Sequence, residues 1–216
     1  MGEQFQLLHP KIREQYSLRP DDRFYWRGRG VMSSIRNGGF HVQPFAMIGS
    51  RRRILFTEKG TDVPFIIENH AYFDTYGRPT ITWLREFDFE VPRRFDEYLV
   101  FSERRQCAVV LAGTRQHLAV DLELSVTDEG AFHLRSKGQR VHTRRLACRF
   151  PRIMSGDAIV TERYCDRSDH FEIDVEIRNP IVGMLFAYQG SFTLEQAPKD
   201  QPGLTRIRPR TENARE

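Results

Sequence analysis

The stretch from His170 to Leu194 constrains the fold more than any other part of this chain. Its first half alternates charged residues with apolar ones, and the apolar members are Phe171, Ile173, Val175 and Ile177. A period of two predicts a strand with one buried side and one solvent-facing side. Asn179-Pro180 ends this run, since proline has no N–H to give to a strand ladder, and Gly183 suits a turn. The alternation then resumes up to Leu194, so the stretch predicts two antiparallel strands.

The same alternation recurs along most of the chain. It predicts strands over residues 24–35, 63–73, 81–89, 94–102, 107–112, 116–126 and 158–165, with a further strand from Phe132. Short turn sequences such as Tyr76-Gly77-Arg78-Pro79 join neighbouring strands as hairpins. We therefore predict a mainly β (α+β) fold, in which a strongly curled antiparallel sheet forms an open or closed barrel.

Helical spacing is clear only near the start of the chain. Apolar residues lie three and four positions apart there, at Phe5, Leu8, Ile12 and Tyr16. This spacing predicts an N-terminal helix that is either kinked at Pro10 or begins there. Residues 1–195 are predicted to form a single β-rich globular domain. Residues 196–216 contain three prolines, many charges and few apolar side chains, so we expect a flexible C-terminal tail.

Two glycines interrupt the first predicted strand on its more apolar face. Gly28 and Gly30 leave a patch of bare backbone there. Such a patch fits a β-bulge, a sharp coil of the sheet or the close approach of a ligand. The pair is not a dinucleotide fingerprint, because the third glycine and the strand–turn–helix context are missing.

The composition narrows the class of protein. The chain has 216 residues, enough to bury a core without disulfides, and its three distant cysteines are expected to be free thiols in a reducing compartment. No signal-peptide pattern and no run of ~18 apolar residues occurs, so a cytoplasmic location without a membrane span is expected. The formal charge of +4 comes from scattered arginines interleaved with acids, which indicates a mixed solvated surface and no nucleic-acid partner.

Familiar catalytic patterns are missing from the sequence. It holds no P-loop, HExxH or GxSxG motif and no clustered metal ligands, so no metal, cofactor or catalytic residue is assigned. Glu68 and His70 share one face of a predicted strand. Such a pair suits proton transfer in a cleft or, as a plainer interpretation, a weak ion pair at the surface.

The candidate site consists of polar residues that interrupt apolar faces. They are Asn69, Arg85, Glu162 and Tyr188. In one interpretation they are structural: Arg85 pairs with Glu162, and the Tyr188 hydroxyl bonds to backbone within a filled core. In the other they line a pocket and orient a mostly apolar ligand by its carboxylate or carbonyl group. A register slip of one residue would turn Asn69 or Arg85 outward.

Several short runs stand in a fixed order along the chain. They are Gly28–Met32, Pro64–Asn69, Thr82–Phe87, Gln116–Leu122, Arg149–Pro151, Arg178–Pro180 and Tyr188–Phe192. Together they resemble a bacterial family of domains of unknown function, over roughly Phe5 to Phe192. That family occurs alone or fused behind NAD-binding domains of the saccharopine-dehydrogenase-like or epimerase-like kind. The resemblance implies no activity, and the fusion suggests a role beside small-molecule redox or lipid metabolism by association only.

These observations lead to one main hypothesis and two alternatives. The main hypothesis is an uncharacterised, non-catalytic cytoplasmic module that binds an apolar or amphipathic small molecule inside the curled sheet. Arg85 would anchor an anionic group, with Asn69 and Tyr188 as hydrogen-bonding partners and Glu162 in the same set. The first alternative is an enzyme acting with an NAD-dependent oxidoreductase partner, with Glu162 or the Glu68–His70 pair as acid or base. The second is a plain interaction domain that dimerises through an edge strand.

Overall fold

The structure is a computed structural model that describes residues 2–39, 53–142, 147–149, 155–201, 203 and 207–216. It begins with a 3₁₀ helix, η1 (Gly2–Leu7), and a short α-helix, α1 (Pro10–Tyr16). His9 is the N-cap of α1, and its side chain accepts a hydrogen bond from the backbone N–H of Lys11. Proline is well suited to the first helical position, because the N–H that it lacks has no partner inside the helix. The predicted helix therefore begins at Pro10 and is not kinked there.

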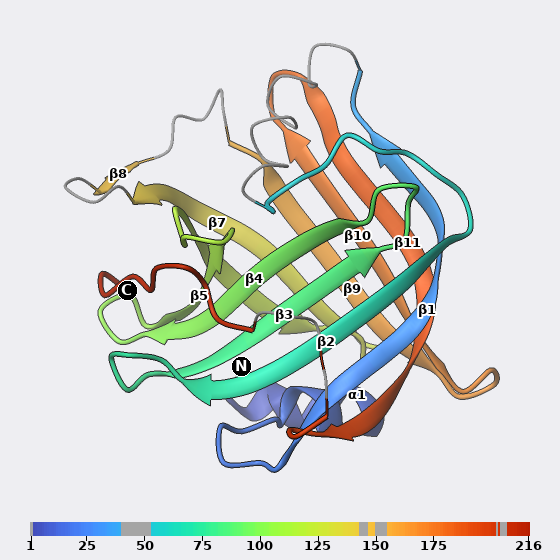
Figure 1. The fold of residues 1–216 in the computed structure, drawn as a ribbon, viewed down its shortest axis with the longest axis horizontal. Helices are drawn as coiled ribbons and strands as arrows, with labels where there is room; N and C mark the ends of the chain where they lie inside the picture. The colour runs from blue at the N-terminus through green and yellow to red at the C-terminus, as the bar shows by residue number, and fades with distance from the viewer. Residues whose placement is uncertain (1, 40–52, 143–146, 150–154, 202, 204–206) are drawn as a thin grey trace.

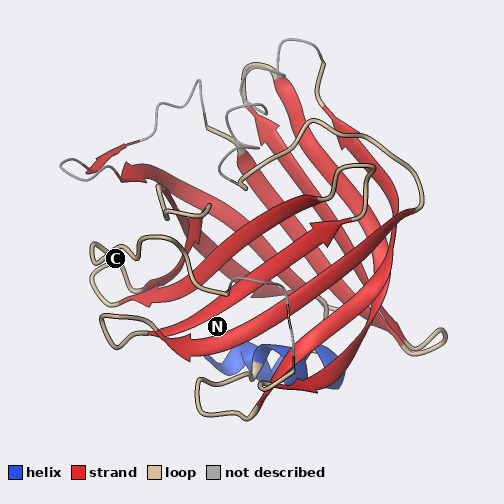
Figure 2. Ribbon diagram, in the orientation of Figure 1, coloured by secondary structure: helices blue, strands red, loops and turns tan. Residues whose placement is uncertain are grey.

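Eleven strands follow in the described residues. They are β1 (Phe24–Asn37), β2 (Val63–Phe73), β3 (Pro79–Phe87), β4 (Arg93–Ser102), β5 (Cys107–Ala112), β6 (Leu118–Val126), β7 (Phe132–His142), β8 (Ala147–Arg149), β9 (Asp157–Cys165), β10 (His170–Asn179) and β11 (Gly183–Pro198). Their order in the sheet is β6-β5-β4-β3-β2-β1-β11-β10-β9-β7-β8, and β6 also pairs with β7. Ten strands thus close into an antiparallel barrel, with β8 attached to β7 (Figure 1, Figure 2). The predicted antiparallel barrel with an N-terminal helix is confirmed, and it is closed.

Strands β1 and β11 join the early and late parts of the chain. They are long, at 14 and 16 residues. Their register pairs Phe24 with Pro198 at one end and Asn37 with Phe186 at the other, and it shifts once along the way. This pairing links the β2–β6 half of the barrel to the β10–β9–β7 half, so it is essential to closure.

The close approach of β1 and β11 explains a glycine on each strand. A Cβ atom at Gly30 would lie 2.6 Å from the Cα of Phe192, and one at Gly190 would lie 2.6 Å from the Cα of Met32. Packed side chains do not approach backbone so closely. The glycines therefore permit an irregular, tightly coiled strand pair, which agrees with the bulge or coil interpretation of the bare backbone.

The interior of the barrel holds the main hydrophobic core. Its buried members include Met32, Phe65, Ile67, Trp83, Phe87, Phe95, Phe132, Phe171, Phe186 and Phe192. Helix α1 lies across one end of the barrel, at the bottom of Figure 1. From this helix Ile12 is fully buried, and Tyr16 stacks on Phe132 at a ring-centroid distance of 4.3 Å. One face of the helix thus packs into the core, while Lys11 and Glu14 on its other face are exposed.

The described end of the chain contacts the barrel wall. Strand β11 runs to Pro198, past the start of the tail that composition predicted. Farther on, the Thr82 hydroxyl donates to the Ile207 carbonyl at 2.9 Å, and the Arg210 N–H donates to the Thr114 carbonyl at 2.6 Å. The flexibility of residues 196–216 and the domain boundary before them stay predictions. Any motion of this segment has to break these contacts.

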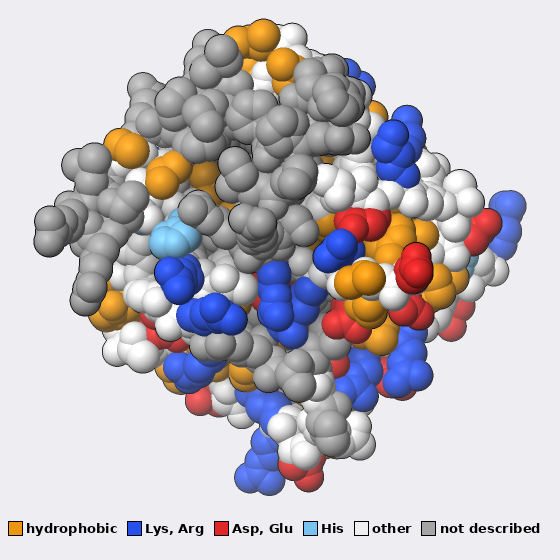
Figure 3. Space-filling view, turned by 45° about the horizontal axis from the view of Figure 1, so that its top comes forward, with side chains coloured by type: hydrophobic (Ala, Val, Ile, Leu, Met, Phe, Trp, Pro, Cys, Tyr) orange, Lys and Arg blue, Asp and Glu red, His pale blue; other side chains and the backbone are white. Residues whose placement is uncertain are grey.

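Charges of both signs are mixed on the surface. Figure 3 shows Lys and Arg side chains across the middle of one face, with Asp and Glu side chains beside them. On the outer side of β9 and β10, Arg163 pairs with Glu172 at 2.6 Å. This is the mixed surface that the sequence indicated. Among the described residues, no helix has the length and apolar character that a membrane crossing requires.

We predict that Gly30→Ala destabilises the barrel by about 1–3 kcal/mol, the usual range for overpacking. The added methyl group would press on the backbone of β11 at Phe192. Urea unfolding gives the free energy of unfolding. The matched control is Arg29→Ala, an exposed neighbour on the same strand, which should stay within ~0.5 kcal/mol of the parent. Parent-like stability of Gly30→Ala would contradict the close-approach argument.

Candidate functional site

The residues singled out from sequence lie on the inner wall of the barrel. Their exposed fractions are 3% for Asn69, 6% for Arg85, 3% for Glu162 and 2% for Tyr188. Asn69 on β2 lies opposite the core residue Trp83. Arg85 on β3 lies opposite the core residue Ile67. Directly opposed residues of an antiparallel pair share a face, so both side chains point inward and the register slip does not occur.

Arg85 finds a carboxylate on the next strand, β4. Its Nη1 makes a salt bridge and hydrogen bond with Oε2 of Glu97. The structure thus pairs Arg85 with Glu97, and not with Glu162 as the structural interpretation expected. The guanidinium also lies over the rings of Trp83 and Phe95, at 5.6 and 5.7 Å from their centroids. Burial lowers the pKa of Arg85, but the surrounding acidic groups raise it above its ordinary value, so the charge persists.

Glu162 on β9 is a buried carboxyl group at the end of the barrel that α1 covers. The Tyr16 hydroxyl donates to its Oε2 at 3.2 Å. Burial raises the pKa of Glu162 to about 7, against the opposing effects of the Gln15 side chain, the charge on Arg85 and the Tyr16 hydrogen bond. Near neutral pH this carboxyl group is therefore divided between its neutral and charged forms.

Tyr188 on β11 adds a proton donor to the same region. Its ring meets Phe87 edge-on at 5.3 Å. Burial raises the pKa of Tyr188 to about 12; Arg85 opposes the shift, while Glu97 and Glu162 add to it. The hydroxyl therefore keeps its proton at physiological pH. These mutual effects require the charged groups to lie near one another inside the barrel.

Three of the four residues singled out from sequence have a buried polar atom that makes no hydrogen bond within the described part of the chain. Asn69 Oδ1, Arg85 Nε and Glu162 Oε1 are buried and have no hydrogen-bond partner among the residues that the structure describes. An unsatisfied buried polar atom costs about 1–3 kcal/mol, and protein interiors therefore satisfy nearly all of them. The inner wall thus offers an unused guanidinium donor, an amide oxygen and a titratable carboxyl group.

The core around the inner wall includes apolar side chains that are not fully covered. Several of them pack against the core and yet are only half-buried: Leu99, Leu118, Val120 and Leu124. The Glu97 side chain keeps 19% of its surface exposed. Solvent thus reaches part of the Glu97 carboxylate that pairs with Arg85, and part of these apolar side chains. This combination suits a molecule with an apolar body and one polar group.

Sequence reasoning missed two members of this group. Glu97 alternates with Phe95 and Leu99 on an apolar face, which is the same signal that singled out Arg85. Tyr16 belongs to the apolar spacing of the N-terminal helix, where a phenol is easily counted as core. Only the position of α1 across the barrel end shows that its hydroxyl reaches Glu162.

The Glu68–His70 pair lies on the opposite face of β2 from Asn69. His70 Nε2 contacts Glu68 Oε2 at 2.9 Å, and Arg27 Nε contacts Glu68 Oε1 at 3.1 Å. The His70 ring stacks on Tyr25 at 4.2 Å. Glu68 and His70 are 1% and 6% exposed, so the expectation of a pair exposed at the surface was wrong. Neighbouring side chains and Gly203, which lies against Glu68, cover the pair.

Two surface depressions lie apart from the inner wall. One, of about 550 Å³, lies over β9, β10 and β11, and another, of about 300 Å³, lies between α1 and β11. Neither is lined by Asn69, Arg85, Glu162 or Tyr188. In the described part of the chain, no three His, Cys, Asp or Glu side chains are grouped to hold a metal ion.

The fold and the inner wall define a closed antiparallel β-barrel with a small polar group in an apolar interior. Residues 8–192 match the family described as "Domain of unknown function (DUF4166)", and the chain belongs to this family. It is also 30% identical over 193 residues to "Uncharacterized protein YndH" of Bacillus subtilis (strain 168), across 89% of this chain and 93% of that protein. Membership in a family of unknown function is thus confirmed. Fusion to NAD-binding domains stays a prediction.

We predict that Glu162 makes the fold less stable as the pH rises. Its pKa is raised to about 7 from an ordinary 4.5. Between these two pH values the folded state therefore binds more protons than the unfolded state. The free energy of unfolding should fall across this pH range by up to ~3 kcal/mol. Glu162→Gln should remove this part of the pH dependence, which urea unfolding at several pH values measures.

The control for this experiment is Glu172→Gln on β10. The hydrogen bond from Arg163 lowers the pKa of Glu172, so this carboxylate acts in the opposite direction, favouring the folded state as it ionises. An unchanged pH slope in Glu162→Gln would contradict the assignment of a raised pKa.

Proposed function

We propose that this domain binds an amphipathic small molecule with a carboxylate head inside the barrel. The observation that carries the proposal is the set of buried, unpartnered atoms at Asn69, Arg85 and Glu162. A bound carboxylate would satisfy two of them, because it would accept from Arg85 Nε and from protonated Glu162. Asn69 Oδ1 is itself an acceptor, so an O–H or N–H group of the ligand would have to donate to it. Tyr188 would supply a further O–H donor. The carboxylate would remove the desolvation penalty that Arg85 Nε and Glu162 Oε1 otherwise carry.

The apolar part of the ligand has a matching surface. The half-buried side chains of Leu99, Leu118 and Val120 would lose their remaining contact with water when covered. A closed barrel of this size suits such a role, because barrels of this kind enclose ligand cavities. Arg85 would fix the orientation of the head group, as a buried charged residue does in many small-molecule sites.

Glu97 sets the strength of this anchor. It already neutralises Arg85, so a ligand carboxylate has to share the guanidinium with it. The neutral form of Glu162 helps, because it contributes no second negative charge beside the ligand. Binding of a carboxylate should therefore strengthen as the pH falls through about 7, as Glu162 takes up its proton.

The cellular setting is part of the same proposal. We place the protein in the bacterial cytoplasm, which the free thiols of Cys107, Cys148 and Cys165 support. An NAD-dependent oxidoreductase as partner rests on the family resemblance alone. If Glu162 transfers a proton to a substrate of that partner, the domain is an enzyme instead, and its raised pKa favours this second candidate.

We predict that decanoate binds the full-length protein and that the charges at Arg85 and Glu97 act in opposite directions. Glu97→Gln frees the guanidinium, so affinity should rise about tenfold or more, the worth of one charge-assisted hydrogen bond. The double variant Arg85→Gln/Glu97→Gln removes both charges without leaving one unpaired, and it should lose the gain. Isothermal titration calorimetry measures all three affinities.

Decanol is the matched control, because it has the same apolar chain without the charge. Its affinity should be equal in the three proteins. Native mass spectrometry of the purified protein, compared with its denatured mass, would reveal a retained natural ligand of the same class. Equal decanoate affinities across the variants, or no binding to any of them, would contradict the proposal. A ligand whose mass changes on incubation, and does not change with Glu162→Gln, would favour the enzyme.

A further inference from the structure

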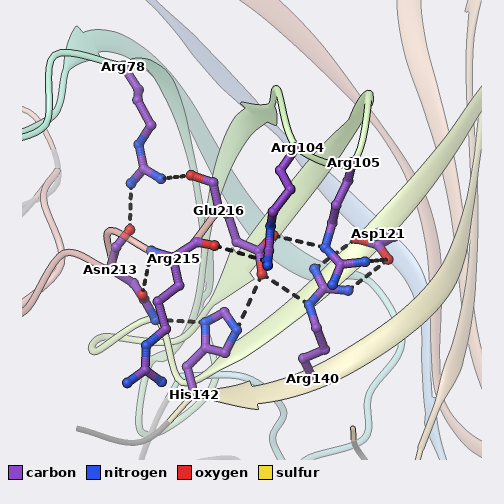
Figure 4. Close-up of polar contacts among 9 residues, drawn as sticks. All are labelled: Arg78, Arg104, Arg105, Asp121, Arg140, His142, Asn213, Arg215 and Glu216. Carbon is purple, nitrogen blue, oxygen red and sulfur yellow. Dashed lines mark hydrogen bonds and ion pairs between the residues drawn. The ribbon is translucent and has the colours of Figure 1, made fainter. Parts of the chain in front are cut away.

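A second carboxylate is enclosed on the other side of the barrel wall. The Glu216 side chain is fully buried, with 0% exposed. Arg140 Nε and His142 Nε2 contact its Oε1 at 3.0 and 3.3 Å, and Arg105 Nε contacts its Oε2 at 3.2 Å (Figure 4). Both carboxylate oxygens therefore have nitrogen partners from the barrel itself.

Asp121 on β6 holds the arginines in place. Its carboxylate accepts from Nη1 and Nη2 of Arg140, each at 2.7 Å, and from Nη1 of Arg105 at 3.3 Å. Each guanidinium therefore keeps its Nε–H free to point at Glu216, as Figure 4 shows. Since Asp121 belongs to the barrel, this arrangement does not depend on Glu216.

Asn213 orients the histidine. Its Oδ1 accepts from the backbone N–H of Arg215 at 3.0 Å, so its Nδ2 is the group that faces His142 Nδ1, at 2.7 Å. An amide nitrogen donates, so Nδ1 of His142 accepts and Nε2 carries the hydrogen that points at Glu216. The neutral histidine is thus already a donor to the carboxylate.

Two further arginines bind backbone oxygens of the same segment. Arg78 donates to the carbonyl of Asn213 at 2.6 Å and to the backbone oxygen of Glu216. Arg104 donates to the carbonyl of Arg215 at 3.3 Å. The surface therefore contacts both the acidic side chain and the main chain that carries it. The acidic side chain and its main chain are thus bound together, which favours an acidic residue within a peptide over an isolated carboxylate.

The charges of the cluster explain its preference for an anion. Arg78 is already paired with Asp74 at 2.7 Å. Against Arg104, Arg105 and Arg140, the barrel supplies the carboxylate of Asp121. Burial raises the pKa of Glu216, but His142 and the arginines lower it to about 2, so the side chain is an anion at all ordinary pH values. A second anion is what the cluster requires.

We infer that Arg105, Arg140 and His142 form a carboxylate-binding site on the outer wall. Glu216 of the same chain fills this site in the structure. An acidic peptide segment of a partner protein would bind there by displacing Glu216. The site is separate from the barrel interior, so its failure would leave the proposed ligand site untouched. Charge complementarity argues for an acidic partner, because Arg105 and Arg140 share the single carboxylate of Asp121 and one positive charge is left over without Glu216.

The test uses the full chain with Glu216→Ala, which empties the carboxylate pocket and keeps Asp121. Acetate should bind this variant at least about tenfold more tightly than acetamide, its neutral isostere, and should raise its melting temperature. Nuclear magnetic resonance titration measures both affinities. In Glu216→Ala/Arg105→Gln the acetate affinity should drop about tenfold, because one donor is lost. Equal affinities for acetate and acetamide, or no effect of Arg105→Gln, would overturn the inference.

A second experiment, with peptides, distinguishes a peptide partner from a free carboxylic acid as the ligand of this site. The probe is a peptide of residues 211–216, amidated at its last residue, and the control is the same peptide with glutamine in place of the last glutamate. The first peptide should compete with acetate on Glu216→Ala and the control should not. If acetate binds and neither peptide competes, the site takes small carboxylic acids and the peptide partner is wrong.

Discussion

The pairing of β1 with β11 is the constraint on which the rest of this structure depends. A curled sheet that stayed open would leave two edges with unpaired N–H and C=O groups, and closure removes both. Gly30 and Gly190 let the two backbones approach closely enough for this. Because closure turns one face of every barrel strand inward, the isolated polar residue on each apolar face becomes buried in a single enclosed space. The polar group inside the barrel is a consequence of that geometry.

The enclosed space then decides which charges persist. Arg85 is held by Glu97, and the two charges neutralise one another. Among the described residues, Glu162 has only the Gln15 side chain, the charge on Arg85 and a phenol hydrogen bond from Tyr16 to oppose burial, so its pKa is raised to about 7 and both forms coexist near neutral pH. Since Arg85 and Glu97 cancel, the net charge of this group of residues depends on Glu162 alone. An interior of this kind tolerates an apolar molecule with one polar head far better than a highly charged one.

Much of this fold was predictable, because strand alternation is a local property of the sequence. The alternation at residues 63–73 and 81–89 predicted both the hairpin and the inward direction of Asn69 and Arg85. The partner of Arg85 was not predictable, because it depends on the register of β4 against β3, which brings Glu97 opposite Trp83. The burial of Glu68 and His70 was missed for a similar reason. Alternation says which face a residue occupies, but not what other segments later cover that face.

The two buried carboxyl groups show how position, and not residue type, sets what a site does. Glu162 lies inside the barrel with a phenol as its hydrogen-bond donor, and burial raises its pKa to about 7. Glu216 lies on the outer wall, where His142 and two arginines outweigh burial and lower its pKa to about 2. Glu162 can gain or lose its proton near neutral pH, so the interior could match the charge of the ligand that we propose. Glu216 stays ionised at ordinary pH values. In the outer site that we propose, only another anion would replace it. The inner ligand site and the outer carboxylate site that we propose would therefore act independently, because they lie on opposite faces of the same wall.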